Sequence, residues 1–437
     1  MDFTQLYKHS AGCISLSKGG HLVLTATQDR LVLRRTDTFQ IIQTWQFDAS
    51  LSPTQALVST KGTKGGSPEN LISHIGWSCD SEYVLAASVN RGVVHVYKVQ
   101  GEPWTARIES GAEGLVKAEW APDGRTVLCF SQWGLRVTVW SLVTGSATYI
   151  QFPLHPDTGY AFRAGWADTF IAERHKSKDT AGVYDTADSY KLVRHFPLPT
   201  SSLSSLASSP TGNHLAVWEG PIQPGILMAC FLAVGGWDDK VSSESVPVSW
   251  PTASRFIVQT IWREPSKWQE TTEGRGFLSY ERLHGPHSIA IQRADQTKPN
   301  AKSGTIQLDW NKNGTLLLAR FENTPTAVHI FDFPLPEQAF SPQLRAVLLH
   351  SQPVLHARWN PVRKGSLTLC CGGRSIYMWN DEWVNDKGES EEVAECIGVP
   401  AREFETRDCQ WTPDGKGLVL LDKTAFCMCF EVEEEDI

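Results

Sequence analysis

Residues 120–130 read Trp120-Ala-Pro-Asp-Gly124, then Arg-Thr, then the apolar run Val127-Leu-Cys-Phe130, and this stretch decides the fold. A tryptophan is followed four residues later by a glycine, and then by a run of β-forming residues. Asp-Gly tolerates the positive backbone angles that a tight hairpin turn requires. The run after the turn is continuously apolar, as in a strand that is buried on both faces. The stretch therefore predicts a hairpin whose second strand is covered from both sides.

The same pattern recurs along the chain, and most copies begin with a tryptophan. From Trp77 to Ser208 successive copies are 43, 46 and 42 residues apart, and from Trp310 to Trp411 they are 49 and 52 apart. Propeller repeats of the WD type span about 40–45 residues, so these spacings indicate one repeat plus loop extensions. We expect six tryptophans to be structural anchors of the repeat: Trp77, Trp120, Trp166, Trp310, Trp359 and Trp411.

The repeat predicts an all-β, WD-type β-propeller that spans residues 1–437, with eight or nine degenerate blades in one ring. In a propeller each blade is a small antiparallel sheet between two neighbours, so its inner strands have no solvent face. Helical repeats of similar length do not fit, because the apolar runs are short, β-branched and bounded by turns. The Trp-Asp signature itself is weak, because no predicted third strand ends in Trp-Asp.

Several regions depart from the repeat. We expect inserted loops at 49–70, which is rich in Ser, Thr, Gly and Lys, and at 381–405, which is acidic and expected to be exposed. A longer insertion, 250–304, contains several aromatic residues, so part of it should pack on the ring or form an irregular blade. One blade is expected to be truncated near residues 220–230, because Phe231 to Gly235 resembles a strand that comes too early; a skipped or mispredicted exon would explain it.

Charge and cysteine content restrict the function classes. The formal net charge of −8 argues against a general nucleic-acid binder and against a polybasic membrane anchor. The longest apolar stretch, Gly225 to Trp237, is shorter than the roughly 20 residues that span a bilayer. The N-terminal residues lack the pattern of a secretory signal, so we expect the ten cysteines to be reduced and buried.

The sequence predicts a protein-binding scaffold and not an enzyme. No catalytic constellation is evident, and His284 and His287 lack further ligands at zinc spacing, so neither a metal nor a cofactor is expected. The inner strands are expected to begin with apolar residues, which disfavours a catalytic site in the central channel. A binding residue should break the repeat, and exposed aromatic and arginine side chains are usual interface anchors. The candidate partner-binding residues are Trp237, Asp238, Trp262, Trp268, Arg275, Tyr280 and Arg282.

Read as a whole, the chain resembles the family called WD repeat-containing protein eight, in its fungal branch. The match runs nearly end to end, except around residues 220–230 and in the fourth repeat. The residues that carry it are Met1-Asp-Phe-Thr-Gln-Leu-Tyr-Lys8, Trp120 to Arg125, Leu135 to Leu142, Phe231 to Asp238, Gly274-Arg-Gly-Phe-Leu-Ser-Tyr280 and Asp295 to Asn300.

The resemblance implies a role at spindle poles and centrosomes. It implies a complex with a coiled-coil anchoring protein and a minus-end-directed kinesin, which tethers microtubule minus ends at the spindle pole body or another microtubule-organising centre. Residence in the cytoplasm and its cytoskeleton is expected accordingly. The alternative is a propeller adaptor of another complex, either a substrate receptor of a ubiquitin ligase or a linker of a vesicle coat.

Overall fold

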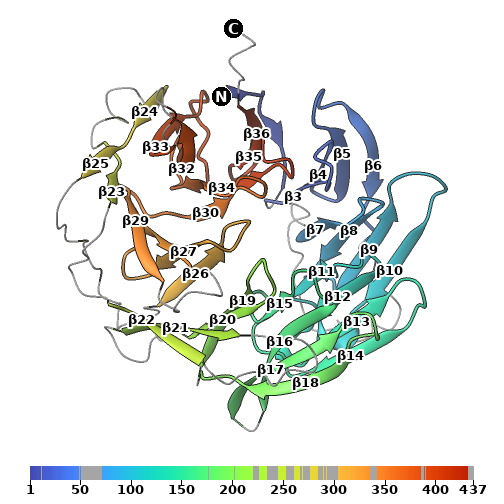
Figure 1. The fold of residues 1–437 in the computed structure, drawn as a ribbon. Coiled ribbons are helices and arrows are strands. Elements are labelled where there is room, and N and C mark those ends of the chain that lie inside the picture. The colour runs from blue at the N-terminus through green and yellow to red at the C-terminus, as the bar shows by residue number, and fades with distance from the viewer. Residues whose placement is uncertain are drawn as a thin grey trace.

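The predicted hairpins assemble into sheets that follow one another around a ring (Figure 1). The computed structural model describes residues 1–10, 12–48, 50, 71–175, 177–200, 202–219, 226–233, 245–251, 260–265, 268, 276–283, 289, 292, 304–334, 342–384, 388 and 390–431. Within these residues the strands form eight sheets, which we call blades 1 to 8 in chain order. The prediction of an all-β propeller is therefore confirmed, with eight blades in the described part of the chain.

Blades 1 to 5 each consist of four consecutive antiparallel strands. Blade 1 contains β3 (Ile14–Leu16), β4 (Leu22–Thr27), β5 (Arg30–Arg35) and β6 (Ile41–Gln46), and blade 2 contains β7 (His74–Trp77), β8 (Tyr83–Ser88), β9 (Val93–Lys98) and β10 (Thr105–Glu109). Blade 3 contains β11 (Lys117–Trp120), β12 (Thr126–Phe130), β13 (Arg136–Ser141) and β14 (Ala147–Gln151), and blade 4 contains β15 (Tyr160–Phe162), β16 (Asp168–His175), β17 (Lys178–Asp185) and β18 (Lys191–Pro197). Blade 5 contains β19 (Leu203–Ser208), β20 (His214–Glu219), β21 (Ile226–Ala233) and β22 (Ser245–Pro251). Two short 3-10 helices, η2 (Gly111–Glu113) and η3 (Gln132–Gly134), lie before and within blade 3.

Blades 6 and 7 are widened by strands from the predicted insertion. Blade 6 contains β26 (Thr305–Trp310), β27 (Leu316–Phe321), β28 (Ala327–Asp332) and β29 (Gln343–Leu349), and blade 7 contains β30 (His356–Trp359), β31 (Ser366–Cys370), β32 (Ser375–Val384) and β33 (Ser390–Gly398). The added strands are β23 (Thr260–Arg263) and β25 (Glu281–Leu283) on blade 6, and β24 (Phe277–Ser279) on blade 7. The insertion therefore packs on the ring, as one of the two expectations for it stated.

Blade 8 closes the ring with strands from both ends of the chain. Its inner strands are β34 (Asp408–Trp411), β35 (Gly417–Leu421) and β36 (Ala425–Phe430), and β36 pairs with β1 (Asp2–Phe3) and β2 (Tyr7–Lys8). The N- and C-terminal segments accordingly lie side by side in Figure 1. Because β1 and β2 contain only two residues each, the outer part of blade 8 is narrow.

The hydrophobic core is divided among the interfaces between blades. Each of the eight neighbouring pairs, including blades 8 and 1, shares a cluster of buried residues. The second strands of blades 3, 6, 7 and 8 are buried at every position. This burial on both faces is the reason that these segments are continuously apolar and not alternating.

In every blade but blade 7, the turn after the anchor position is closed by the same two backbone hydrogen bonds. In blade 3 the N–H of Ala121 donates to the carbonyl of Thr126 at 2.9 Å, and the N–H of Gly124 donates to the carbonyl of Ala121 at 3.1 Å. Gly124 has a φ of +65°, and a Cβ placed there would lie 2.9 Å from Sγ of Cys79 in blade 2. Glycine is therefore required both by the turn and by the neighbouring blade.

The anchor tryptophans join each blade to the one before it. The indole N–H of Trp120 donates to the carbonyl of Gly76 at 3.2 Å, and that of Trp77 donates to the carbonyl of Ser15 at 3.1 Å. Trp359 and Trp411 make the equivalent bonds, at 3.0 and 3.1 Å. In each of these four cases the acceptor directly precedes the anchor position of the previous blade, so this backbone carbonyl explains the tryptophan at these four positions.

Trp166 is not an anchor, and this prediction was wrong. In blade 4 the N–H of Arg163 donates to the carbonyl of Asp168, and the N–H of Trp166 donates to the carbonyl of Arg163. Trp166 thus takes the turn position that Gly124 has in blade 3, and the anchor position falls on Phe162. The Trp166 ring is 42% exposed and lies 4.1 Å below the guanidinium of Arg163.

The expected truncation of one blade near residues 220–230 was also wrong. Strands β19 to β22 form a complete four-stranded sheet, in which β21 pairs with β20 from Leu215↔Leu232 to Trp218↔Ala229. Phe231 therefore lies in the third strand of the Ser208 repeat and not in the second strand of a damaged one. The spacing is irregular because the insertion that follows lengthens the distance to the next anchor.

The two expected loops had different outcomes. The loop at 49–70 lies, apart from residue 50, outside the described residues. The segment 381–405 is not an exposed loop, because β32 extends into it to Val384 and β33 (Ser390–Gly398) runs through its middle and pairs with β32. Its acidic residues are accommodated since alternate positions of β33 face outward while Ala394 and Cys396 are buried.

Candidate partner-binding groove

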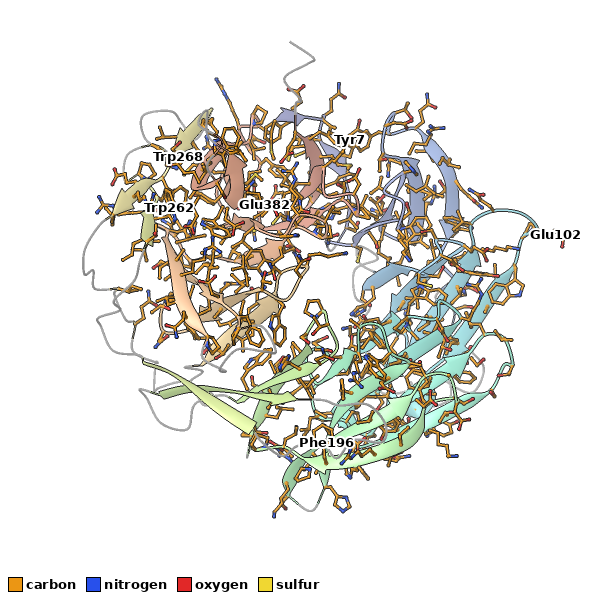
Figure 2. The ribbon with its side chains drawn as sticks, viewed as in Figure 1. Tyr7, Glu102, Phe196, Trp262, Trp268 and Glu382 are labelled. Atoms are coloured by element: carbon orange, nitrogen blue, oxygen red, sulfur yellow. The ribbon has the colours of Figure 1, made fainter. Side chains whose placement is uncertain are left out.

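The aromatic residues predicted to bind a partner are mostly buried. Trp262, Trp268 and Tyr280 belong to the core cluster between blades 6 and 7, and Trp268 is only 2% exposed. Figure 2 labels Trp262 and Trp268 on the outer side of these blades. The expectation that the three side chains are exposed is wrong, because the insertion folds them inward against β29 and β32.

A buried carboxylate holds the insertion in place. Glu264 is 5% exposed, and its Oε1 accepts hydrogen bonds from the Trp268 indole N–H at 3.0 Å and the Tyr377 hydroxyl at 2.8 Å. Its Oε2 accepts from the backbone N–H and the hydroxyl of Ser351, at 2.8 and 2.7 Å. Burial raises the pKa of Glu264, but these hydrogen bonds outweigh burial and hold its pKa below the usual value. The carboxylate is therefore ionised at neutral pH.

Tyr280 forms the second contact of the same network. Its hydroxyl lies 3.1 Å from Nδ1 of His350, and its ring meets that of Tyr377 edge to face. Burial lowers the pKa of His350 to about 4, so this imidazole is neutral at neutral pH. Tyr280 separates β24 on blade 7 from β25 on blade 6, so the segment 277–283 is fixed across the outer edges of both blades.

The remaining candidates have separate positions. Arg282 is exposed, and its guanidinium lies over the ring of Trp262, 5.4 Å from the ring centre. Trp237, Asp238 and Arg275 lie outside the described residues. The structure thus brings Trp262 and Arg282 together, and it places Trp268 and Tyr280 in one buried network.

A groove of about 820 Å³ opens between blades 7 and 8, next to this insertion. One wall is the outer face of blade 7, where Met378, Val393, Ile397 and Phe277 line the groove. The opposite wall includes Met1 and the two residues of the short strand β1, Asp2 and Phe3. The groove exists because β32 and β33 contain ten and nine residues, whereas the strand facing them contains two.

The groove exposes large apolar side chains beside a carboxylate. Phe277 and Trp383 are 59% and 56% exposed, although both line the groove. Glu395 lies between them on β33, paired in register with Met378, and burial raises its pKa. Sequence reasoning missed these three residues; the available signal was a tryptophan inside an otherwise acidic segment, which a solvated loop would not need.

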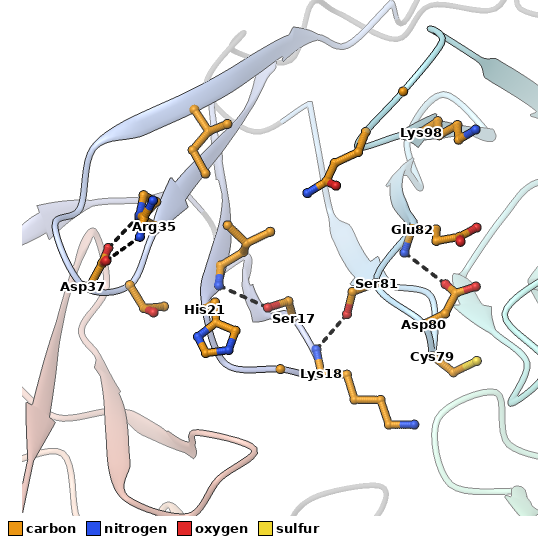
Figure 3. Close-up of a pocket in the computed structure, with 16 residues that line it drawn as sticks. Ser17, Lys18, His21, Arg35, Asp37, Cys79, Asp80, Ser81, Glu82 and Lys98 are labelled. Carbon is orange, nitrogen blue, oxygen red and sulfur yellow. Dashed lines mark hydrogen bonds and ion pairs between the residues drawn. The ribbon is translucent and has the colours of Figure 1, made fainter.

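A larger cleft, of about 1150 Å³, lies between blades 1 and 2, and most of the residues that line it are of polar or charged types (Figure 3). The carboxylate of Asp37 pairs with Arg35 at 2.7 Å, and those of Asp80 and Glu82 pair with Arg125 at 2.5 and 2.7 Å. The hydroxyl of Ser81 accepts a hydrogen bond from the backbone N–H of Lys18, at 2.9 Å. The carboxylates that line the cleft are already paired with arginines of the same chain, so the cleft offers a ligand fewer unpaired charges than its volume suggests.

A third exposed feature is an aromatic patch on blade 3. Trp133 is 90% exposed, and Leu135 and Phe152 are also exposed. Trp133 and Phe152 both adopt left-handed backbone conformations, with φ of 64° and 55°. None of these residues lines the groove between blades 7 and 8, so the patch provides matched exposed aromatics for comparison.

The inner strands carry charges, contrary to the expectation that they begin with apolar residues. Lys117 and Glu119 on β11 are 3.0 Å apart, and Tyr160 on β15 bonds to both. On the other side of the ring, Arg358 on β30 pairs with Asp408 on β34 at 2.9 Å. Lys117 and Glu119 neutralise each other within one strand, and Arg358 and Asp408 do so between neighbouring blades.

Three further findings concern groups that could carry other chemistry. In the described part of the chain, no set of three or more His, Cys, Asp and Glu residues is arranged to hold a metal ion. Nine cysteine side chains are described, none of them in a disulfide, and the burial of all but Cys79 agrees with the predicted burial. None of the described helices is long and apolar enough to cross a membrane.

The ring of blades and its rim groove define a WD-type β-propeller, a fold that fits a protein-interaction scaffold. The chain is similar to the mouse (Mus musculus) protein WD repeat-containing protein WRAP73, with 27% identity over 491 residues that cover 100% of this chain and 97% of the relative. This relative confirms the predicted resemblance to a WD repeat-containing protein family. No protein-family model matches the chain.

Solved structures agree with this fold. The Dos1 propeller superposes with a TM-score of 0.57 at 9% sequence identity, covering 99% of this chain and 97% of that chain. At this identity the likeness shows the fold alone. WD-repeat propellers are generally non-catalytic, which fits the predicted scaffold.

Proposed function

We propose that this protein is a non-catalytic scaffold that holds a partner protein in the groove between blades 7 and 8. The observation that carries the proposal is the exposure of Phe277 and Trp383 on the walls of one groove. Large aromatic side chains that stay exposed beside a concave surface are typical anchors of protein interfaces. The burial of Tyr280, three residues after Phe277, supports the proposal, because a preorganised surface loses less entropy on binding.

We further propose that the scaffold acts at the spindle pole body or another microtubule-organising centre. There it would anchor microtubule minus ends together with a coiled-coil anchoring protein and a minus-end-directed kinesin. The support is the family resemblance over nearly the whole chain, carried by blocks such as Gly274 to Tyr280. In part of that block, Phe277 lies at the rim of the groove, and Tyr280 is buried between blades 6 and 7.

The experiment that tests this function is affinity purification from dividing cells, combined with imaging of a fluorescent fusion. Recovery of a coiled-coil protein and a minus-end kinesin, with foci at spindle poles, is the expected result. Recovery of a ubiquitin ligase or a vesicle coat, without foci at the poles, would instead favour the alternative adaptor function. Recovery of no stable partner from several cell-cycle stages would contradict the scaffold itself.

A further inference from the structure

We propose that the groove between blades 7 and 8 binds a partner segment in which a large apolar side chain lies close to a lysine or arginine. The proposal rests on the scaffold function above and specifies the chemistry of the segment that such a scaffold holds. The apolar side chain packs against Phe277 or Trp383, which lie toward opposite ends of the groove wall, and the cation pairs with Glu395 between them.

The apolar part of the proposal follows from the register of the strands. Phe277 on β24 is directly opposite Ile397 on β33, and Val393 on β33 is opposite Asn380 on β32. Residues that pair directly across strands share a face, and so do alternate residues of one strand. Phe277, Ile397 and Met378 therefore lie on one face of the wall and form an apolar strip that Glu395, opposite Met378, interrupts. Phe277 at one end of this strip is more than half exposed. An apolar side chain of a partner would bury apolar surface that the short strand β1 leaves exposed to solvent.

The charge on the groove specifies the second part. Asp2, Glu395 and Glu431 line it, with Arg363 as the one basic side chain. Arg363 is already paired with Glu431, through a hydrogen bond of 2.8 Å from Nη1 to Oε1 and a second one from Nη2. Glu395 has no such side-chain partner in the described part of the chain, and the Met1 amino group is the positive charge that acts on it. The walls thus carry an excess of negative charge beside apolar surface, which a basic and apolar segment complements.

Charge also decides against the chain's own C-terminal residues as occupant. Residues 433–436 read Glu-Glu-Glu-Asp, so they have the same sign as Glu395 and Asp2. A segment from another protein with the opposite sign is the occupant that the groove favours. A second copy of this chain and the C-terminal residues are the competing occupants.

The test uses the full-length chain and a phage-displayed library of random peptides of about twelve residues, a length that covers short strand or helix epitopes. Selected peptides are synthesised with a fluorophore, and their affinities are measured by fluorescence polarisation. We expect the binders to combine Phe, Trp or Leu with Lys or Arg. Glu395→Lys should weaken them at least about tenfold, since it replaces an attractive charge with a repulsive one. The matched control is Glu102→Lys, an exposed residue of blade 2 that does not line the groove.

A second pair of variants tests the apolar contact without changing charge. Trp383→Ala should weaken the same peptides about tenfold or more, whereas Trp133→Ala on blade 3 should leave them unchanged. Thermal melts of all four variants verify that each remains folded. The proposal is overturned if the binders lack basic residues, or if Glu395→Lys and Glu102→Lys weaken them equally.

Two further results would overturn the proposal by naming another occupant. Removal of residues 432–437 that strengthens peptide binding more than about tenfold would assign the groove to the chain's own terminus. Concentration-dependent dimerisation in light scattering that Phe277→Ser abolishes would assign it to a second copy. The spindle-pole function is judged separately: wild-type foci absent from poles contradict that function, while the peptide affinities alone decide the groove chemistry.

Discussion

The interfaces between blades 2 and 3 and between blades 6 and 7 both bury a tryptophan whose indole N–H finds an acceptor, but the acceptors differ. Trp120 donates to the backbone carbonyl of Gly76, which any residue at that position would supply. Trp268 donates to the carboxylate of Glu264, which also needs Tyr377 and Ser351 as donors. A repeat interface therefore depends on one side chain, whereas the insertion depends on a charged network.

This difference explains why the two kinds of tryptophan serve different purposes. The repeat anchors hold the ring together through contacts that recur from blade to blade. The network of Glu264 fixes one particular segment, which in turn holds Phe277 at the rim of the groove. We therefore expect variants of the anchors to affect the ring, and variants of the network to affect the insertion and the groove.

The largest effect is expected for Trp120→Ala. It removes a buried indole and its bond to the previous blade, and should lower the free energy of unfolding by about 3–5 kcal/mol. Urea denaturation monitored by circular dichroism measures the change. If Trp133→Ala, which alters a 90% exposed tryptophan, were equally destabilising, the account of the anchors would be wrong.

An intermediate effect is expected for Trp268→Phe, which keeps an aromatic ring but removes the donor to Glu264. A buried acceptor that loses a hydrogen bond costs about 1–3 kcal/mol. The same denaturation experiment measures it, with Trp262→Phe as the matched change in the insertion, since no donor bond to a carboxylate is lost there. Equal losses for the two variants would show that packing alone, and not the carboxylate, fixes the insertion.

The charged network also predicts a dependence on pH that the repeat interfaces lack. The pKa of Glu264 in the folded state lies below the value of 4.5 for a free side chain, so the unfolded state binds its proton more tightly. The stabilisation is thus complete above about pH 4.5 and is lost as the pH falls through the folded-state pKa. The difference in unfolding free energy between wild type and Glu264→Gln should therefore shrink from about pH 6 to about pH 3. A constant difference over this range would contradict the ionised carboxylate.

The smallest effect on stability is expected for Trp383→Ala. Its side chain is more than half exposed, so the free energy of unfolding should change by no more than about 0.5 kcal/mol. A thermal melt that matches wild type is the expected result. A loss as large as that of Trp120→Ala would mean that Trp383 is a packing residue and that the groove has no exposed anchor.

The sequence predicted the features that depend on local chemistry repeated in each blade. The turn at Gly124 and the apolar strand after it specify the hairpin, and the recurrence of both specifies the ring. Trp166 was misassigned because hydrophobic identity alone does not distinguish a turn position from an anchor one turn earlier. The completeness of blade 5 could not be predicted, because an insertion and a deletion change the spacing of anchors in similar ways.

The candidate site was predicted in its region but not in its residues. The insertion was correctly singled out as a break in the repeat, yet the burial of Trp268 and Tyr280 depends on residues far along the chain. His350 lies 70 residues after Tyr280, and Tyr377 lies 113 residues after Glu264, the acceptor of the Trp268 indole. The exposure of Phe277 depends on the shortness of β1 at the other end of the chain. Such contacts between remote segments leave no local pattern to detect.

The most direct test of the groove is hydrogen–deuterium exchange on the full-length chain, alone and in the native complex purified from dividing cells. Backbone amides of β24 (Phe277–Ser279) and β33 (Ser390–Gly398) should exchange more slowly in the complex. Those around Asp80 and Lys98, in the cleft between blades 1 and 2, should exchange at the same rate in both states. Protection confined to that cleft, with β24 and β33 unchanged, would contradict the account.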